Sequence, residues 1–404
     1  MKKLSFFILL IFLLLKNDKY FASEFEKVGE YERFRKDDGS FASSEFVTHQ
    51  GKKYYINENG YKNVKSWLII DGHYYYSDLN GEIYEDGKYF IDDNYFYFDK
   101  EGRLMKGWID GIYYANEDGC LVDGFQELEM LDEWRIGDKK DMYDAWFYFN
   151  PQTKKKLYAE GDEFICRSIG TSKYCFDQDG VMCTGWKLIK DTTPVMKGYM
   201  FFAEESTDKF NYGEALYNTW FATEPPVDVI PNGEVKYFSF MSNGMLRCAN
   251  SEDGLQIYRI DTKSFLFNEY GYALYGIRKV GNDYYYFGPN DNNCSMKTGL
   301  INLINSAGEE INYYFEDNGK GYSGVYKNKL YYKGRLQKAA PFIKYASFKV
   351  NGGERLVNSA GVVMKNKKKI KDGNGVVWSS DENGYVTYTE DGIPDELLLP
   401  EVED

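Results

Sequence analysis

The sequence predicts an all-β protein, a solenoid of stacked aromatic β-hairpin repeats about 20 residues long with a small C-terminal β module. The first supporting observation is composition, because aromatic residues make up 18% of the 404 residues, with 38 Tyr, 28 Phe and 7 Trp. The second is an excess of turn formers, since 39 Gly stand against 9 Pro. The third is the alternation of short aromatic runs with glycine turns along most of the chain. A disordered chain would instead be poor in aromatic residues.

Residues 1–22 are expected to form a secretory signal. Two lysines precede a largely apolar run, residues 4–15, which suits the core of a signal and is shorter than the roughly 20 residues that span a bilayer. An uncleaved anchor is the alternative, since bulky Tyr20 and Phe21 lie where small residues are preferred before a cleavage site. The sequence therefore predicts a secreted protein with no transmembrane helix after signal cleavage.

The expected mature chain is strongly acidic. The full sequence carries 49 basic and 63 acidic residues, and loss of the signal removes four lysines and one aspartate, which leaves a net charge of −17. A field of this sign repels nucleic acids and other polyanions. We therefore expect no nucleic-acid partner.

A hairpin unit recurs through the middle of the chain. Each unit contains an aromatic strand, and the first runs start at residues 54, 74, 95 and 113, a spacing of about 20 residues. A polar turn that ends in glycine follows, such as NENG at Gly60, and such turns supply the positive φ angles of tight hairpins. A small residue and an apolar residue come next, as in Gly107 and Trp108. Residues 107–125 show one complete unit.

Stacking explains why the units are so aromatic. A single two-stranded hairpin is only marginally stable in water. When one hairpin stacks on the next, the aromatic face of each is buried, and a ladder of Tyr, Phe and Trp replaces a large central core.

Scarce histidine and the cysteine pattern argue against catalytic and metal sites. The chain has only 2 His and no Cys-x-x-Cys pair, whereas catalytic triads and zinc sites need more. The turn at residues 177–180 is too short for an EF-hand calcium loop. Cys166 and Cys175 flank a turn-like segment and are placed to join a hairpin, although the sequence leaves their oxidation open. The other four cysteines are interpreted as small core residues. We expect no catalytic residue, metal or cofactor.

Changes of sequence texture divide the chain into five segments. They are the signal at 1–22, a charged N-terminal segment at 23–50, hairpin repeats at 51–335 that are degenerate around 187–275, a C-terminal β module at 336–390 and an acidic tail at 391–404. The longest stretches without clear repeats, 126–145 and 187–236, are too short to build a catalytic cleft with its own core. The sequence therefore predicts a protein that is not an enzyme. The basic run 365–371 is interpreted as a solvated edge strand, with docking to phosphate-bearing polymers as the alternative.

The repeated unit resembles the cell-wall-binding repeats of Gram-positive surface proteins, the choline-binding type among them, and is similar to the C-terminal repeats of large clostridial toxins. The shared pattern is Gly-Trp, an aromatic doublet, Asp/Asn-x-x-Gly and a second Gly-Trp, and it is clearest at residues 51–125 and 174–186. The resemblance implies a hairpin solenoid that holds an exported protein on a cell surface. It also implies that wall polymers or glycans bind in grooves between hairpins.

The resemblance also assigns roles to individual residues. In the choline-binding type, the Trp of Gly-Trp and a Trp that opens the doublet cage a quaternary ammonium with an aromatic residue of the next hairpin, and each ring contact contributes about 0.5–2 kcal/mol. Here most residues that open the doublet are not aromatic, such as Lys53, and a lysine there would repel choline. The candidate ligand-binding residues are Trp67, Tyr75, Trp108, Tyr114, Trp146, Trp186 and Trp220.

The favoured ligand is a cell-wall polysaccharide or teichoic acid, because Tyr and Trp faces stack on sugar rings, and choline is the alternative. Each Trp also has a purely structural interpretation, as a plug of the seam between two hairpins. Two functions remain open. One is a surface protein held on the wall of its producer, and the other is a secreted adhesin or toxin-like module that binds host glycans.

Overall fold

A computed structural model of the protein describes residues 22–161, 163–190, 192–231, 233–250 and 254–402. The expected signal at 1–22 lies almost entirely outside these residues. The described residues form two compact units: unit 1 contains those within Met1–Ile165 and Phe176–Met182, and unit 2 contains those within Cys166–Cys175 and Cys183–Asp404. Within the described ranges, no helix is long and apolar enough to cross a membrane.

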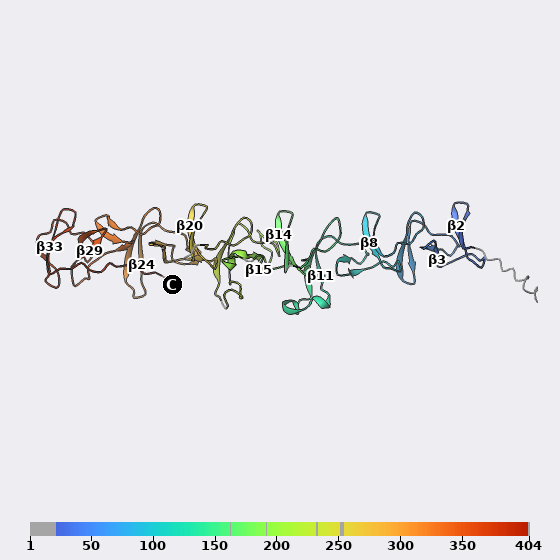
Figure 1. The fold of residues 1–404 in the computed structure, drawn as a ribbon, viewed down its shortest axis with the longest axis horizontal. Helices are drawn as coiled ribbons and strands as arrows, with labels where there is room; N and C mark the ends of the chain where they lie inside the picture. The colour runs from blue at the N-terminus through green and yellow to red at the C-terminus, as the bar shows by residue number, and fades with distance from the viewer. Residues whose placement is uncertain (1–21, 162, 191, 232, 251–253, 403–404) are drawn as a thin grey trace, which may run out of the picture. The chain divides into compact units, whose positions relative to one another are not determined.

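Unit 1 is a succession of antiparallel two-stranded hairpins (Figure 1). Its pairs are β1 (Glu24–Val28) with β2 (Tyr31–Arg35), β3 (Glu45–His49) with β4 (Lys52–Ile56), β5 (Ser66–Ile70) with β6 (His73–Ser77), β7 (Gly87–Ile91) with β8 (Asn94–Phe98), β9 (Gly107–Ile109) with β10 (Tyr113–Ala115), and β11 (Gly124–Glu129) with β12 (Asp144–Phe149). The 3-10 helices η1 (Asp132–Trp134) and η2 (Gly137–Lys139) connect β11 to β12. The next hairpin, β13 (Phe164–Ile169) with β14 (Ser172–Asp177), contains residues of both units.

Unit 2 combines hairpins with three larger sheets. Its hairpins are β15 (Gly185–Leu188) with β16 (Tyr199–Phe202), β17 (Thr219–Thr223) with β18 (Lys236–Phe240), β22 (Ile277–Val280) with β23 (Asp283–Tyr286), and β29 (Tyr345–Val350) with β30 (Gly353–Asn358). The larger sheets are β19 (Leu255–Ile260), β20 (Lys263–Asn268) and β21 (Ala273–Leu274); β24 (Gly299–Ile304), β25 (Glu310–Phe315), β28 (Arg335–Leu336), β27 (Lys329–Tyr332) and β26 (Gly324–Tyr326), in spatial order; and β31 (Ile370–Lys371), β32 (Val377–Ser380) and β33 (Val386–Glu390). Two 3-10 helices, η3 (Val195–Gly198) and η4 (Asp291–Asn293), complete the unit. The predicted all-β fold of hairpin repeats is confirmed.

One backbone hydrogen bond recurs between successive hairpins. In several repeats, the second residue after the turn glycine donates its N–H to a carbonyl on the second strand of the preceding hairpin. In unit 1 the N–H groups of Ile83, Leu104 and Leu121 donate in this way to Lys53, Tyr74 and Tyr95, each at 2.8 Å. The same bond occurs in unit 2, where Ala215 donates to Lys173 at 2.9 Å. This bond therefore fixes the register between the successive hairpins that it joins.

The turn glycines are needed for two reasons at once. Gly119 has a φ of +81°, a region that side chains with a Cβ rarely adopt, and a Cβ placed there would lie 2.6 Å from Cδ2 of Leu104. Gly271 of unit 2 has a φ of +82°, and its Cβ would lie 2.4 Å from Cδ2 of Leu246. Leu104 and Leu246 each follow the turn glycine of the preceding repeat by two positions. The repeated Asp/Asn-x-x-Gly pattern therefore encodes both the turn and the contact between repeats.

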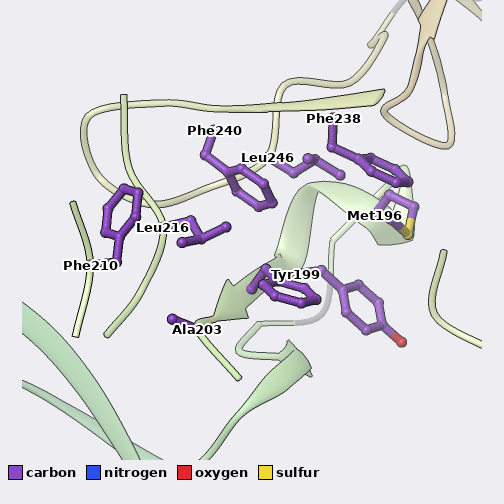
Figure 2. Packing of buried hydrophobic residues seen from close by; sticks show 9 residues of the cluster. Met196, Tyr199, Ala203, Phe210, Leu216, Phe238, Phe240 and Leu246 are labelled. Atoms are coloured by element: carbon purple, nitrogen blue, oxygen red, sulfur yellow. The ribbon is translucent and has the colours of Figure 1, made fainter. Parts of the chain in front are cut away.

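The core is divided into small clusters that follow the hairpins. The largest fully buried side chains in the described residues are all Phe or Tyr, as the predicted aromatic ladder requires. Figure 2 shows one cluster of unit 2, in which side chains from η3, β16, β18 and the intervening loops face a common interior; its labelled members are Met196, Tyr199, Ala203, Phe210, Leu216, Phe238, Phe240 and Leu246.

Hairpins begin earlier than residue 51, where we placed the first repeat. Residues 23–50, which the sequence marks only as charged, contain the hairpin β1–β2 and the strand β3. Phe25 and Phe34 face each other across β1–β2, and their ring centroids lie 5.1 Å apart. Alternating charged residues hide this hairpin, because it lacks an aromatic doublet.

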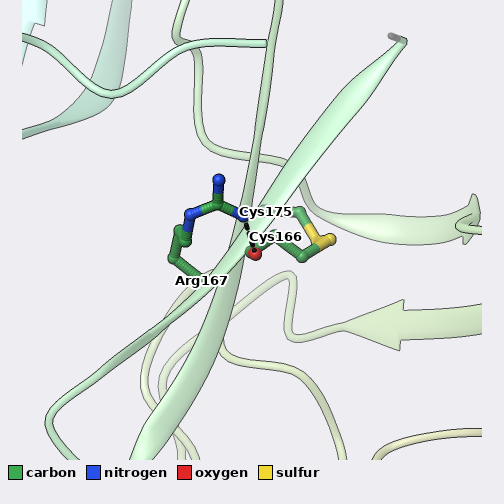
Figure 3. The surroundings of a disulfide bond; sticks show 3 residues. All are labelled: Cys166, Arg167 and Cys175. Atoms are coloured by element: carbon green, nitrogen blue, oxygen red, sulfur yellow. Dashed lines mark hydrogen bonds between the residues drawn. A yellow bond between two sulfur atoms is a disulfide. The ribbon is translucent and has the colours of Figure 1, made fainter.

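A disulfide bond joins Cys166 in β13 to Cys175 in β14, as the turn-like segment between them allows (Figure 3). Nη1 of Arg167 donates a hydrogen bond of 2.9 Å to the carbonyl oxygen of Cys166. The other cysteines are free thiols, three of them buried: Cys183, Cys248 and Cys294. Burial raises the thiol pKa of both Cys248 and Cys294 to about 11, which keeps these two groups protonated and unreactive.

The acidic tail packs against unit 2. Gln337, which is 0% exposed, donates through Nε2 to the carbonyl oxygen of Leu398 at 2.9 Å and accepts from the N–H of Leu398 at 2.9 Å. Nη1 of Arg335 donates to the carbonyl oxygen of Leu399 at 2.6 Å, and Nη2 pairs with Glu401 at 3.1 Å. The buried side chain of Gln337 thus binds the backbone of the tail through two hydrogen bonds.

Replacing Gln337 with leucine is expected to lower the free energy of unfolding of unit 2 by about 1–3 kcal/mol, because the N–H and carbonyl of Leu398 lose their partners. The tail should also become accessible to a glutamate-specific protease. Urea denaturation and limited proteolysis measure the two effects. The exposed Gln152→Leu variant is the control, and equal protease resistance of both variants would contradict this role of Gln337.

Candidate ligand-binding site

Four tryptophans that follow a small residue, which is Gly before Trp108 and Trp186, Ser before Trp67 and Thr before Trp220, occupy equivalent positions. Each is the second residue of the first strand of its hairpin: Trp67 in β5, Trp108 in β9, Trp186 in β15 and Trp220 in β17. Their cross-strand partners are Tyr76, Tyr114, Phe201 and Ser239, respectively. The hairpin repeat therefore presents the indole ring at the same place each time.

Each of these indoles packs on two rings of the following hairpin in the same geometry. The two rings are separated by one residue on the second strand, so they share one face of it. The centroid distances are 5.0 and 6.0 Å from Trp67 to Phe96 and Phe98, 5.0 and 5.9 Å from Trp108 to Phe147 and Phe149, 5.0 and 5.8 Å from Trp186 to Phe238 and Phe240, and 4.8 and 5.6 Å from Trp220 to Phe265 and Phe267. These tryptophans form the seams between hairpins.

A seam position does not bury the indole completely. Trp67 is 37% exposed, and Trp108, Trp186 and Trp220 are half-buried. The indole N–H groups of Trp108 and Trp186 donate to the carbonyl oxygens of Glu129 at 2.9 Å and Glu224 at 2.8 Å. In these two seams the exposed part of the ring, and not its N–H, is therefore what a ligand can reach.

The other three candidates are placed differently. Tyr114 lies 5.3 Å from Trp108, ring centroid to ring centroid, in the same seam. Tyr75 is 6% exposed and packs on Phe46 of the preceding hairpin at 5.0 Å, on the strand face opposite to the partner of Trp67. Trp146 is half-buried and precedes the buried Phe147, so its side chain points away from the seam of Trp108. Of the three, only Tyr114 therefore lies in a seam beside a tryptophan, whereas Tyr75 and Trp146 face away from the seams of Trp67 and Trp108. Ligand binding by any of these residues stays a prediction.

Lysine ammonium groups lie over several rings of unit 1. Nζ of Lys53 lies 4.6 Å from the ring centroid of Phe46, Nζ of Lys62 lies 4.8 Å from Phe25, and Nζ of Lys88 lies 4.6 Å from Tyr95. A ring face attracts a cation electrostatically, and at these rings a lysine of the chain already occupies the face that an external cation would need.

Lys156 is the most enclosed of these lysines. It is 6% exposed, and its Nζ lies 3.8 Å from the ring centroid of Trp134 and 5.3 Å from that of Trp108. Nζ also donates a hydrogen bond to the carbonyl oxygen of Asp179. Burial lowers the pKa of Lys156 to about 8, although the nearby carboxylates of Asp179 and Asp177 raise it.

The carboxylates of the DQDG turn are also engaged. Nζ of Lys139 binds Asp177 at 2.7 Å and binds Asp179 as well. Within the described parts of the chain, no group of three or more His, Cys, Asp or Glu side chains is arranged to hold a metal ion. The two carboxylates of the turn thus pair with Lys139, and the carbonyl oxygen of Asp179 binds Lys156, which lies over Trp108.

The lowered pKa of Lys156 predicts a pH dependence. Unfolding restores the ordinary pKa of 10.5, so between about pH 8 and 10.5 the unfolded chain binds a proton that the folded protein does not. The stability contribution of this group therefore rises with pH across that window, by an amount on the order of 3 kcal/mol. In urea denaturation at a series of pH values, the free energy of unfolding of wild type should increase relative to that of the Lys156→Met variant as the pH rises. A difference that stays constant with pH would show that Lys156 has an ordinary pKa.

Two adjoining cavities flank the seam of Trp186 in unit 2. One has a volume of about 600 Å³ and is lined by Trp186, Phe201 and Glu204 together with residues 222–228 and Val235. The other has a volume of about 450 Å³ and is lined by Phe201 and Glu204 together with Glu205, Phe210 and Phe221 among others. Phe201 and Glu204 line both. We call the two cavities together the Trp186 groove.

The Trp186 groove lies in the stretch where the sequence repeats are degenerate. Sequence reasoning predicted Trp186 but missed Phe201, Phe221 and Glu204. Phe221 could have been found, because it follows Trp220 in a strand and alternation places it on the opposite face, where its ring lies 4.9 Å from that of Phe201. Glu204 has no signal in the sequence, since it lies in the loop after β16.

Comparisons with known proteins support the resemblance locally. Residues 44–62, which contain the hairpin β3–β4, match a family model described as "Putative cell wall binding repeat". The predicted resemblance to cell-wall-binding repeats is confirmed for this repeat. No curated protein matches the sequence.

Similar solved structures come from Streptococcus pneumoniae. Choline binding protein F is 20% identical, with 91% of this chain and 99% of that chain covered and a TM-score of 0.36. CbpJ is 19% identical, with 85% and 99% covered and a TM-score of 0.36. The modular autolysin LytC is 17% identical, with 68% and 52% covered and a TM-score of 0.32.

Proposed function

We propose that this chain is a non-catalytic, exported surface protein whose hairpin repeats bind a cell-wall polysaccharide or teichoic acid through part-exposed tryptophans in the seams. The observation that carries the proposal is the repeated seam geometry of Trp67, Trp108, Trp186 and Trp220, which places four indoles alike along the chain. The match of residues 44–62 to a cell-wall-binding repeat supports the same function.

The Trp186 groove suits a saccharide. Its two cavities, of about 600 and 450 Å³, fall within the usual range for ligand sites. Aromatic rings and carboxylates both line the cavities. Apolar ring faces stack on the C–H faces of sugars while polar groups set orientation.

Choline is less suited to the seams that lysines cover. A quaternary ammonium needs several ring faces free of other cations. Lys156 lies over the rings of Trp134 and Trp108, and Lys53 over the ring of Phe46. These contacts favour saccharide binding in unit 1 over a choline cage.

A retention assay tests the proposal. The mature protein is mixed with purified wall of Gram-positive bacteria, and the bound fraction is measured after washing, with and without millimolar choline. Retention that choline does not reverse is expected. Release by choline would restore the choline alternative, binding only to a host glycan array would favour the adhesin alternative, and no retention on either would overturn the proposed function.

A further inference from the structure

The Trp186 groove has an unbalanced charge. The larger cavity is lined by three carboxylates, Glu204, Glu224 and Asp228, and by no lysine or arginine among the described residues. The smaller cavity adds Glu205 and one base, Lys209. An aromatic wall thus meets a cluster of negative charge in a hollow of the surface.

The negative charge is not neutralised by neighbouring bases. The ion pairs between described residues include none for Glu204, Glu205 or Glu224, and the side chains of Glu204 and Glu205 are exposed. Nζ of Lys209 instead donates to the carbonyl oxygen of Asn218 at 3.3 Å and lies 5.2 Å from the ring centroid of Phe210. The carboxylate of Asp228 accepts a hydrogen bond from the hydroxyl of Tyr199. The free carboxylates therefore remain available to an external cation.

The indole and the free carboxylates lie on the same groove. Trp186 and Glu204 both line the larger cavity, and Trp186 packs on the cluster shown in Figure 2, which fixes its ring. Strand β16 ends at Phe202. The next residue, Ala203, is buried, and the one after it, Glu204, is exposed to solvent. Glu204 thus lies two residues after the end of β16 and lines the same cavity as Trp186.

We propose that the Trp186 groove binds a wall glycan that carries primary ammonium groups, an amino sugar without its acetyl group, with the sugar face on the ring of Trp186 and the ammonium at Glu204. This inference rests on the proposed function and specifies the ligand class at one of its sites.

Three features of the groove favour this ligand over others. A polyanion such as a phosphate polymer would be repelled by the carboxylates. A neutral acetylated sugar would leave them without a cation. A quaternary ammonium has no N–H to donate, whereas a primary ammonium forms charge-assisted hydrogen bonds with carboxylates.

The probe is a pair of soluble tetrasaccharides that differ only in acetylation, the glucosamine tetramer and the N-acetylglucosamine tetramer, with choline as a third ligand. Titration calorimetry of the whole chain should show binding of the glucosamine tetramer that weakens with added salt. The Glu204→Gln variant should bind it about tenfold more weakly. The Glu382→Gln variant, an exposed turn position of the same unit, should bind like wild type.

The outcomes separate this inference from the function on which it depends. Equal binding of the two tetramers, or an unchanged affinity of Glu204→Gln, would overturn the amino-sugar assignment. Wall whose free amines have been chemically acetylated should retain less protein, whereas mild alkali, which removes ester-linked amino acids, should not change retention. Equal retention on untreated and acetylated wall would overturn the assignment and leave wall binding intact. Absence of retention on untreated wall would overturn the proposed function itself.

Discussion

Replacement of Trp108 by alanine is expected to destabilise unit 1 by about 3 kcal/mol, the lower end of the range for a buried aromatic replaced by alanine, because Trp108 is half-buried. Trp108 packs on Phe147 and Phe149 of the next hairpin and on Trp134 of η1, and its indole N–H donates to Glu129. The variant loses all of these contacts and leaves a cavity. Urea denaturation gives the loss, and hydrogen exchange should localise it to β9–β12.

Trp67→Ala is the matched control for this prediction. Trp67 has the same place in its hairpin and the same two ring contacts, but it is 37% exposed, and among the described residues no acceptor binds its indole N–H as Glu129 binds that of Trp108. We therefore expect a clearly smaller loss of stability for Trp67→Ala. Equal losses would mean that the exposed edge of Trp67 is as important for folding as the buried seam, which would weaken its assignment as a ligand contact.

The second large effect is expected for Gly119→Ala. The substitution forces a side chain into a left-handed backbone conformation, at a cost of about 1–2 kcal/mol, and drives its Cβ against Leu104, at a further cost of about 1–3 kcal/mol. Gly72→Ala isolates the first term, because Gly72 has a φ of +80° and nothing lies within 4 Å of its Cβ position.

A double variant separates the two terms experimentally. The double variant Leu104→Ala with Gly119→Ala should lose less stability than the sum of the losses of the two single variants. The smaller side chain at position 104 makes room for the new methyl group at position 119. Denaturation of the four proteins completes the cycle. If Gly119→Ala costs no more than Gly72→Ala, the turn glycines do not form the close contact between repeats that the structure shows.

The repeat could be predicted from sequence because its signals are local. The aromatic doublet and the Asp/Asn-x-x-Gly turn each act within one hairpin, and they predict β5–β6, β7–β8 and β9–β10 directly. The hairpin β1–β2 was missed because charged residues alternate with Phe25 and Phe34 and no doublet marks it. Local pattern recognition therefore works best where the repeat is most regular.

Contacts between distant residues could not be predicted. Lys156 follows its turn like the apolar residues of other repeats, and only the fold shows that its ammonium lies over Trp134. Gln337 binds Leu398, 61 positions away, so no local pattern links them. The Trp186 groove depends on loops that the sequence marks only as degenerate. Irregular stretches inside a repeat array can therefore hold the most distinctive sites.

The central claim is that part-exposed seam tryptophans contact the wall glycan, and the indole N–H signals in an NMR spectrum test it most directly. The seven tryptophans give seven such signals, which variants assign. On addition of soluble wall glycan fragments, the signals of Trp67 and Trp186 should shift, while those of the buried Trp134 and Trp378, 8% and 3% exposed, should not. If the protein is retained on wall while none of the seven signals shifts, the glycan binds elsewhere and the claim is wrong.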